Sequence, residues 1–213
     1  MKRAIGDEQK NQRRDDILRR TADFLLERDF EDVTLSEVAS SLGLVKGTLY
    51  RYFPAKESLV LEILEREMAL WLASVHAGVT PGAAVTIPVL SGILAQSLAD
   101  RPLLVRLFSI VHVLLEKKLP VARIVAFKLA SARLLETGGA FLESVCPPLA
   151  GKGRDALLAL YELAIGVGHL TDRPPAVTEA LNHPGLTIFR LAFKSQLQKT
   201  LTWTLTGLST CRT

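Results

Sequence analysis

The stretch TLSEVASSLGLVKGTLYRYFPAKE, residues 34–57, carries the strongest local signals in the chain. It begins with Thr34 and Glu37, the spacing at which each side chain satisfies a free amide in the first turn of a helix. Gly43 tolerates the left-handed backbone on which helices often end, and Pro54 cannot continue a helix. The stretch therefore predicts two short helices, one on each side of a glycine turn.

Two short helices around a glycine turn are typical of a helix-turn-helix. In that motif the first helix braces against the DNA backbone and the second enters the major groove, which admits one α-helix. The second helix, residues 46–52, suits this task because its exposed positions carry cations, hydroxyls and a glycine. Leu49 and Phe53, four residues apart, should point into a small core instead. The candidate DNA-binding residues are Thr34, Lys46, Gly47, Thr48, Tyr50, Arg51, Tyr52 and Lys56.

Some of these assignments have a structural alternative. Tyr50 and Tyr52 could only pack a three-helix core, as most Tyr-x-Tyr pairs on helices do. Thr34 caps its helix whatever else it contacts. The motif around the two tyrosines favours the interpretation that they face DNA.

The distribution of charge along the chain gives weaker support. The net charge is +4, but residues 1–60 hold eleven basic and eleven acidic side chains, so the excess lies in residues 61–213. Bulk charge therefore does not indicate a nucleic-acid partner. Residues 1–12 are polar and include Lys2, Arg3 and Lys10, and we expect them to form a flexible basic arm along the DNA backbone.

Residues 13–60 resemble the DNA-binding domain of the tetracycline-repressor (TetR) family of bacterial transcription regulators. The matching positions are Thr34, Val38-Ala39, Gly43, Lys46 to Tyr50, Tyr52-Phe53, Lys56-Glu57 and Leu59. Two positions depart from the pattern, because Val45 and Ala55 stand where the family often has serine. Neither side chain can cap the helix that follows or give a hydroxyl to a phosphate.

The resemblance implies an all-α homodimer with N-terminal helix-turn-helix domains and a larger C-terminal domain for ligand binding and dimerisation. It also implies that the motif residues quoted above face double-stranded DNA. A two-fold dimer sets its recognition helices about one DNA turn, or a multiple of it, apart, so the operator should be palindromic.

The remaining sequence has helical periodicity and no strand alternation. The expected helices are 13–28, 34–42, 46–52, 56–76, 86–99, 102–117, 120–145, 154–171 and 186–206, with a short one near 176–182. We therefore expect an all-α fold. A three-helix DNA-binding domain would occupy residues 1–55, and a helical effector-binding and dimerisation domain would occupy residues 56–213.

Composition excludes several classes of protein. The chain has 213 residues, 48% of them hydrophobic and 23% charged, which is typical of a globular protein. The best membrane-span candidate, residues 103–115, is short and contains Arg106 and His112. The polar N-terminus lacks a secretory signal, and Cys146 and Cys211 lie far apart. These features predict a cytoplasmic protein without a membrane span or a disulfide.

No catalytic array is visible in the C-terminal half. The four histidines of the chain stand on different expected elements, and no zinc, redox, hydrolase or phosphate-loop motif occurs. We therefore expect no enzyme activity, no metal site and no cofactor.

A small-molecule cavity is expected among helices 56–77, 86–99, 102–117 and 120–145. Its candidate lining residues are Trp71, Leu94, Phe108, His112 and Phe127, with Arg106 or Arg123 as a possible anchor for a polar or anionic ligand. Apolar residues at this spacing are also explained as plain core. By resemblance, helices near 154–171 and 186–206 should pair with a second subunit, since broad apolar faces need a partner.

The sequence thus predicts a DNA-binding transcriptional regulator, a repressor released by a small-molecule effector. One alternative is a DNA-bound scaffold that recruits a protein partner and has no small-molecule site. A second is a helical-bundle enzyme, against which the missing acid–base and metal clusters count.

Overall fold

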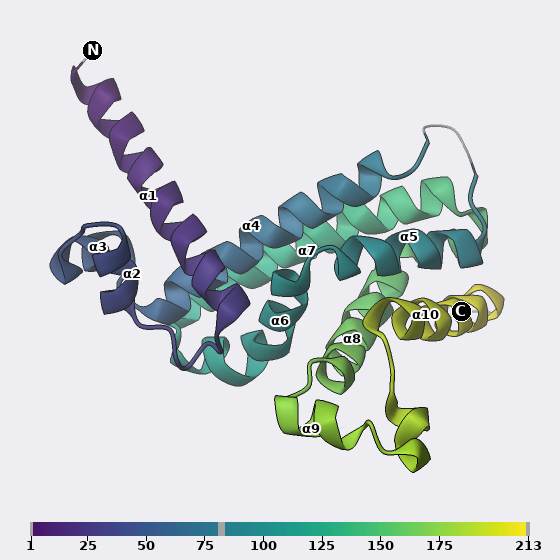
Figure 1. Ribbon diagram of the computed structural model, residues 1–213. Coiled ribbons are helices and arrows are strands. Elements are labelled where there is room, and N and C mark those ends of the chain that lie inside the picture. Colours follow the sequence, from purple (N-terminus) through teal and green to yellow (C-terminus); the bar gives the residue numbers. More distant parts are fainter. Residues whose placement is uncertain (1, 81–83, 212–213) are drawn as a thin grey trace.

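The computed structural model describes residues 2–80 and 84–211, which form helices joined by short loops, with no strand in those two ranges (Figure 1). The α-helices are α1 (Lys2–Glu27), α2 (Leu35–Ser41), α3 (Lys46–Tyr52), α4 (Lys56–Ala77), α5 (Ile87–Ala99), α6 (Pro102–Ile110), α7 (Val121–Val145), α8 (Gly153–Thr171), α9 (Pro175–Ala180) and α10 (Phe193–Thr210). Shorter helical turns are the π-helical η1 (Val111–Leu115) and the 3-10 segments η2 (Glu116–Lys118), η3 (Pro147–Leu149) and η4 (Pro184–Phe189). The predicted all-α class is confirmed.

The N-terminal helix begins earlier than the sequence predicted. α1 starts at Lys2, and its first half extends away from the rest of the molecule (Figure 1). Residues 2–12 are therefore helical, and their role as a flexible arm along DNA stays a prediction. This stretch contains no proline and is rich in Lys, Arg, Glu and Gln, all good helix formers, so the helix continues through it.

The first three helices and the start of α4 enclose a small core. Leu49 and Phe53 of the α3 region are buried in it as predicted, together with Ile17 of α1 and Val38 of α2. Gly43 has a φ of +65°, the left-handed conformation predicted for the end of α2. The turn therefore sets α2 and α3 against α1 and leaves the other face of α3 uncovered.

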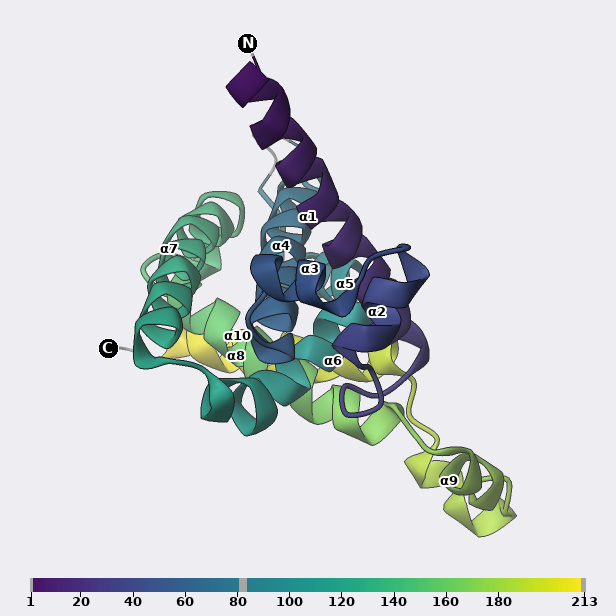
Figure 2. The ribbon, with the colours of Figure 1, turned by 90° about the vertical axis from the view of Figure 1, so that its left-hand side faces the viewer.

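α4 connects this small unit to the C-terminal helices. It starts at Lys56 beside α3, packs against α1, and continues along α5 and α7 (Figures 1 and 2). Apolar residues along α4, including Leu59, Ile63 and Leu72, are buried. One continuous helix therefore contacts both parts of the molecule.

The C-terminal helices pack closely around α8 and α10. At the crossing of α7 and α8, a Cβ atom on Gly153 would lie 2.1 Å from the carbonyl oxygen of Gly139. A Cβ on Gly168 would lie 2.9 Å from a methyl of Val105 on α6. Gly168 therefore allows close packing of α8 against α6. α10 lies against α5 and α8.

Two expected helices differ from the structure. The helix predicted over 102–117 is α6 followed by the π-helical η1 and the 3-10 turn η2. The helix predicted over 186–206 begins only at Phe193, because Arg173 donates hydrogen bonds to the carbonyl oxygens of Phe189 (2.8 Å) and Leu191 (3.0 Å). These bonds hold the chain in a non-helical conformation just before α10.

Residues 172–192 project from the helical bundle, as both views show (Figures 1 and 2). α9 within this segment has no buried residue. Among the helices of the described ranges, none has the length and apolar character needed to cross a membrane.

Candidate functional site

Thr34 forms the cap that the sequence predicted. Its Oγ1 accepts a hydrogen bond from the Glu37 amide (3.2 Å), and the Glu37 carboxylate accepts one from the Thr34 amide (3.0 Å). Hydrogen bonds from Thr34 and Arg28 lower the pKa of Glu37 to about 2. The start of α2 is therefore fixed, and Thr34 is exposed at the surface.

α3 presents several of its polar residues to solvent. Lys46, Gly47, Tyr50 and Arg51 are exposed, and the Tyr50 side chain is 42% exposed. The ammonium of Lys46 lies 5.7 Å from the centroid of the Tyr50 ring, and Arg51 donates to the Thr48 hydroxyl (3.3 Å). A Cβ on Gly47 would meet nothing within 4 Å. Packing inside the chain therefore does not explain the glycine.

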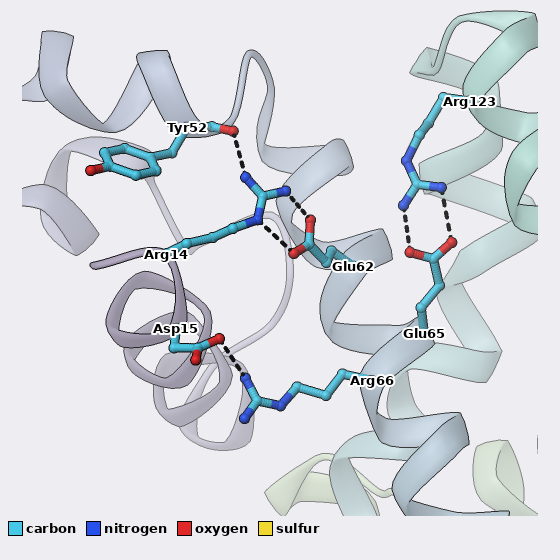
Figure 3. Close-up of polar contacts among 7 residues, drawn as sticks. All are labelled: Arg14, Asp15, Tyr52, Glu62, Glu65, Arg66 and Arg123. Atoms are coloured by element: carbon cyan, nitrogen blue, oxygen red, sulfur yellow. Dashed lines mark hydrogen bonds and ion pairs between the residues drawn. The ribbon is translucent and has the colours of Figure 1, made fainter. Parts of the chain in front are cut away.

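Tyr52 is placed differently from Tyr50. It is half-buried and packs against the core, and its carbonyl oxygen accepts a hydrogen bond from Arg14 of α1 (3.3 Å). Its hydroxyl points away from the Arg14 guanidinium (Figure 3). The packing alternative therefore applies in part to Tyr52, while Tyr50 stays open to an external partner.

Among the predicted DNA-binding residues, Lys56 differs most from its expected placement at the DNA-facing surface. Its ammonium donates to the carbonyl oxygens of Phe30 (2.6 Å) and Val33 (2.8 Å) and lies 4.1 Å from the centroid of the Phe30 ring. Burial lowers its pKa. Lys56 therefore fastens the loop between α1 and α2 to the start of α4, instead of presenting a free cation to DNA.

Ion pairs join α1 and α7 to α4 (Figure 3). Arg14 forms a two-pronged pair with Glu62, with one contact of 2.8 Å, and its guanidinium lies 4.4 Å from the centroid of the Phe53 ring. Asp15 pairs with Arg66 at 3.2 Å. Arg14 is therefore part of the contact between α1 and α4.

The two predicted ligand anchors bind other groups. Arg123 of α7 makes a bidentate pair with Glu65 of α4 at 2.9 and 2.6 Å, which raises the pKa of the guanidinium. Arg106 of α6 donates to the carbonyl oxygens of Leu25 (2.9 Å) and Leu26 (3.1 Å) at the end of α1. Neither arginine lines the cavity described next, so both anchor predictions are wrong there.

A cavity of about 380 Å³ lies among α4, α6 with η1, α7 and α8. Four predicted residues, Trp71, Phe108, His112 and Phe127, line it. Leu94 of α5 does not line it and is buried in the hydrophobic core. Ligand binding by the four lining residues stays a prediction.

Sequence reasoning missed the polar partners of His112. The Nε2 atom of His112 lies 2.7 Å from the hydroxyl of Tyr161 on α8, and its Nδ1 lies 3.1 Å from Glu116. Glu116 is paired at 2.6 Å with Lys128 on α7. His112 and Glu116 are four residues apart, a spacing that places both on one face of a helix. Periodicity could not reveal Tyr161 and Lys128, because only tertiary packing brings α7 and α8 to this segment.

The outer faces of α8 and α10 carry uncovered apolar and small residues. Trp203 is 64% exposed, and Leu170 is exposed on α8. A Cβ on Gly166 of α8, or on Gly207 of α10, would meet nothing within 4 Å. Glycine in a helix interior costs about 1 kcal/mol relative to alanine. Packing inside this chain gives no reason for either glycine.

This combination of a braced, exposed α3 and a helical C-terminal core defines a helix-turn-helix protein, and family comparisons agree. The family described as "Bacterial regulatory proteins, tetR family" matches residues 17–63, and "Tetracyclin repressor-like, C-terminal domain" matches residues 65–212. The chain belongs to the TetR family, which confirms the resemblance.

Individual relatives match over shorter stretches. The transcriptional repressor KstR2 of Mycolicibacterium smegmatis is 31% identical over 85 residues, 40% of this chain and 41% of that protein. KstR of Mycobacterium tuberculosis is 35% identical over 104 residues, 47% of this chain and 46% of the relative. The chain thus spans less than half the length of these curated relatives.

Solved structures show the same fold. A bacterial regulatory protein of the tetR family from Rhodococcus has a TM-score of 0.58 at 16% sequence identity, covering 90% of this chain and 96% of that one. A transcriptional regulator of the TetR/AcrR family from Thermobifida fusca has a TM-score of 0.56 at 17% identity, covering 95% and 100%.

Proposed function

We propose that this protein is a sequence-specific, DNA-binding transcriptional repressor that acts as a homodimer and is released from DNA by a small-molecule effector. Residues 1–55 would bind DNA, and residues 56–213 would bind the effector and the second subunit. One observation carries the proposal. The inner face of α3 is anchored by Leu49 and Phe53, and its outer face presents Lys46 and Tyr50 to solvent.

The exposed α3 face has the chemistry that major-groove binding needs. Lys46 and Arg51 supply cations for phosphates or guanine, and the Thr48 hydroxyl can bond to a base edge or a phosphate. Tyr50 offers a hydroxyl and a ring face that suits sugars and thymine methyls. Gly47 lets the backbone approach closely. Lys56 is left out of this proposed contact set, because it binds carbonyl oxygens within the protein.

Dimerisation is supported by the uncovered faces of α8 and α10. Gly166 and Gly207 would let a second copy approach closely, and Trp203 and Leu170 would be buried by it. The contact region differs from the predicted helix 186–206, since α10 begins at Phe193. A two-fold dimer would read a palindromic operator.

Release is supported by the continuity of α4. The helix leaves the DNA-binding unit at Lys56 and contributes Leu64, Met68 and Trp71 to the cavity wall. A ligand that binds better to the conformation with low DNA affinity shifts the population away from DNA, and only this difference in affinity can do so. The cavity also favours this function over a scaffold without a ligand site.

The first experiment is selection of DNA from random duplexes by the purified protein at near-physiological salt. A palindromic site bound much more tightly than a scrambled site would support the proposal. Salt-sensitive binding with no enriched sequence would overturn it, since only the phosphate backbone would then be read.

The recognition helix is tested with Tyr50→Ala on the enriched site. We expect at least a tenfold loss of operator affinity, about 1.4–3 kcal/mol, because the substitution removes contacts that we propose lie in the major groove. Val177→Ala on α9 is the matched control, since Val177 is 44% exposed and lies outside α3. Circular dichroism and sedimentation check that fold and assembly are unchanged. Equal operator affinity of Tyr50→Ala and the parent protein would refute the assignment.

A further inference from the structure

The cavity has an apolar interior and a polar mouth. Its wall includes buried Leu64, Leu98 and Leu160, whereas the side chain of His112 is 47% exposed. His112 stands in the π-helical turn η1, a rare geometry that often occurs at functional sites. Its partner Tyr161 lies edge-on to Phe108, with ring centroids 4.9 Å apart. A ligand would therefore place its apolar body inward and its polar group beside His112 and Tyr161.

The hydrogen bonds already formed at the mouth determine which donors and acceptors a ligand can use. Burial disfavours the charged form of Glu116, but hydrogen bonds from Lys128 and His112 outweigh it and lower the pKa of this carboxyl. In the neutral form of His112, the carboxylate accepts the Nδ1 proton (3.1 Å), and Nε2 is then an acceptor.

Tyr161 then donates its one proton to His112. The contact between the hydroxyl and Nε2 is 2.7 Å, and burial, with the nearby charge of Glu116, raises the pKa of Tyr161 to about 12. The hydroxyl is therefore protonated at neutral pH, and its donor is already used. Its oxygen can still accept a hydrogen bond.

The donors of the other polar groups in the cavity wall also form hydrogen bonds within the protein. The Trp71 ring N–H donates to Ser97 (2.9 Å), and the Ser131 hydroxyl donates to the Phe127 carbonyl oxygen (3.0 Å). Lys128, the one lysine or arginine among the described residues that line this cavity, is neutralised by Glu116 at 2.6 Å. The mouth therefore offers an acceptor at Tyr161 and no uncompensated positive charge.

From this arrangement we propose that the cavity binds an uncharged, mainly apolar molecule that carries a hydroxyl group. The apolar body lies between α4 and the α7–α8 pair, and the hydroxyl donates a hydrogen bond to the Tyr161 oxygen. The volume of about 380 Å³ falls within the range of small-molecule sites. The inference rests on the proposed function in one respect: such a molecule would be the effector that releases DNA.

The test measures ligand binding without DNA. Of the two tryptophans, Trp71 lines the cavity and Trp203 lies on the outer face of α10, so Trp203→Phe leaves one fluorescent reporter at the site. The probes are 1-decanol, decyl methyl ether and decanoate, which share a ten-carbon chain. Decanol can donate a hydrogen bond, the ether can only accept one, and decanoate is charged.

Decanol should quench Trp71 fluorescence with at least tenfold higher affinity than the ether or decanoate. Tyr161→Phe, in the same background, should lower decanol affinity to that of the ether while leaving ether binding unchanged. Ser144→Ala is the control, because it removes an exposed hydroxyl of α7 outside the cavity lining.

Two outcomes would overturn the inference. One is tighter binding of decanoate than of decanol, lost in Lys128→Met, which would mean that the mouth selects an anion. The other is the absence of quenching by all three probes up to their solubility limits.

The operator assay separates this inference from the proposed function. Decanol that binds but does not release operator DNA would support the ligand class and refute the proposed release. Specific operator binding by a protein that binds none of the probes would support the regulator and refute the ligand class.

Discussion

Two lysines of the same motif, Lys46 and Lys56, differ in what surrounds them. Lys46 is exposed on α3, and its closest aromatic neighbour is the Tyr50 ring. Lys56 donates to main-chain carbonyl oxygens of the loop that precedes α2. The first is available to a phosphate, and the second stabilises the fold that presents α3.

Replacing each of the two lysines by methionine should distinguish the two roles. Lys46→Met should weaken operator binding and reduce the slope of log affinity against log salt by about 1, with unchanged stability. Lys56→Met should lower the free energy of unfolding by about 1–3 kcal/mol, because hydrogen bonds to a charged donor are lost. Salt titrations of DNA binding and urea unfolding measure the two effects. A loss of stability in Lys46→Met, with none in Lys56→Met, would contradict the assignment.

At the scale of elements, the segment formed by η1 and η2 contacts both the cavity and the DNA-binding unit. His112 and Glu116 belong to the cavity mouth. Lys118, at the end of the same segment, pairs at 3.2 Å with Glu57 in the first turn of α4. A displacement of the cavity mouth can therefore be transmitted through the Lys118–Glu57 ion pair to the first turn of α4, which follows α3 in the chain.

Lys118→Met should uncouple ligand binding from DNA release. We expect unchanged quenching of Trp71 by decanol, but a several-fold weaker effect of decanol on operator affinity, because the contact with Glu57 is lost. The neighbouring Lys117→Met is the control, since Lys117 is also exposed in this segment. Equal coupling in the two variants would exclude a role for the ion pair.

Local signals predicted most of the elements, and tertiary contacts explain the exceptions. The Thr34–Glu37 cap, Gly43 and Pro54 act within a few residues, so the bounds of α2 and α3 could be inferred from sequence. The late start of α10 could not, because the hydrogen bonds that hold residues 189–191 come from distant Arg173.

The candidate sites follow the same rule. The exposed face of α3 is encoded by adjacent residues, and it was predicted. The partners of His112 were missed because Tyr161 lies 49 residues away and only packing brings the two side chains together. Leu94 was misassigned because helical spacing does not distinguish a cavity wall from a filled core.

At the scale of the whole molecule, we propose that the two uncovered faces on α8 and α10 form the contact with a second copy. Gly166→Arg places a long charged side chain where we propose that a second copy packs. Sedimentation should show a shift from dimer to monomer, and affinity for a two-half-site operator should fall at least tenfold. Ala180→Arg on exposed α9 adds the same charge elsewhere and is the control. A dimeric Gly166→Arg protein with full affinity would place the interface elsewhere.

The backbones of α7 and α8 are in direct contact at Gly139 and Gly153, where no side chain separates the two helices. We expect this contact to act as the fulcrum of any rotation of α7 against α8. Phe127 lies twelve residues from Gly139, about 18 Å along the helix axis. A rotation of about 5° at the fulcrum moves Phe127 by roughly 1.5 Å. If the cavity widens by rotation of α7 about this contact, the displacement of α7 increases with distance from Gly139, toward its N-terminal end at Val121.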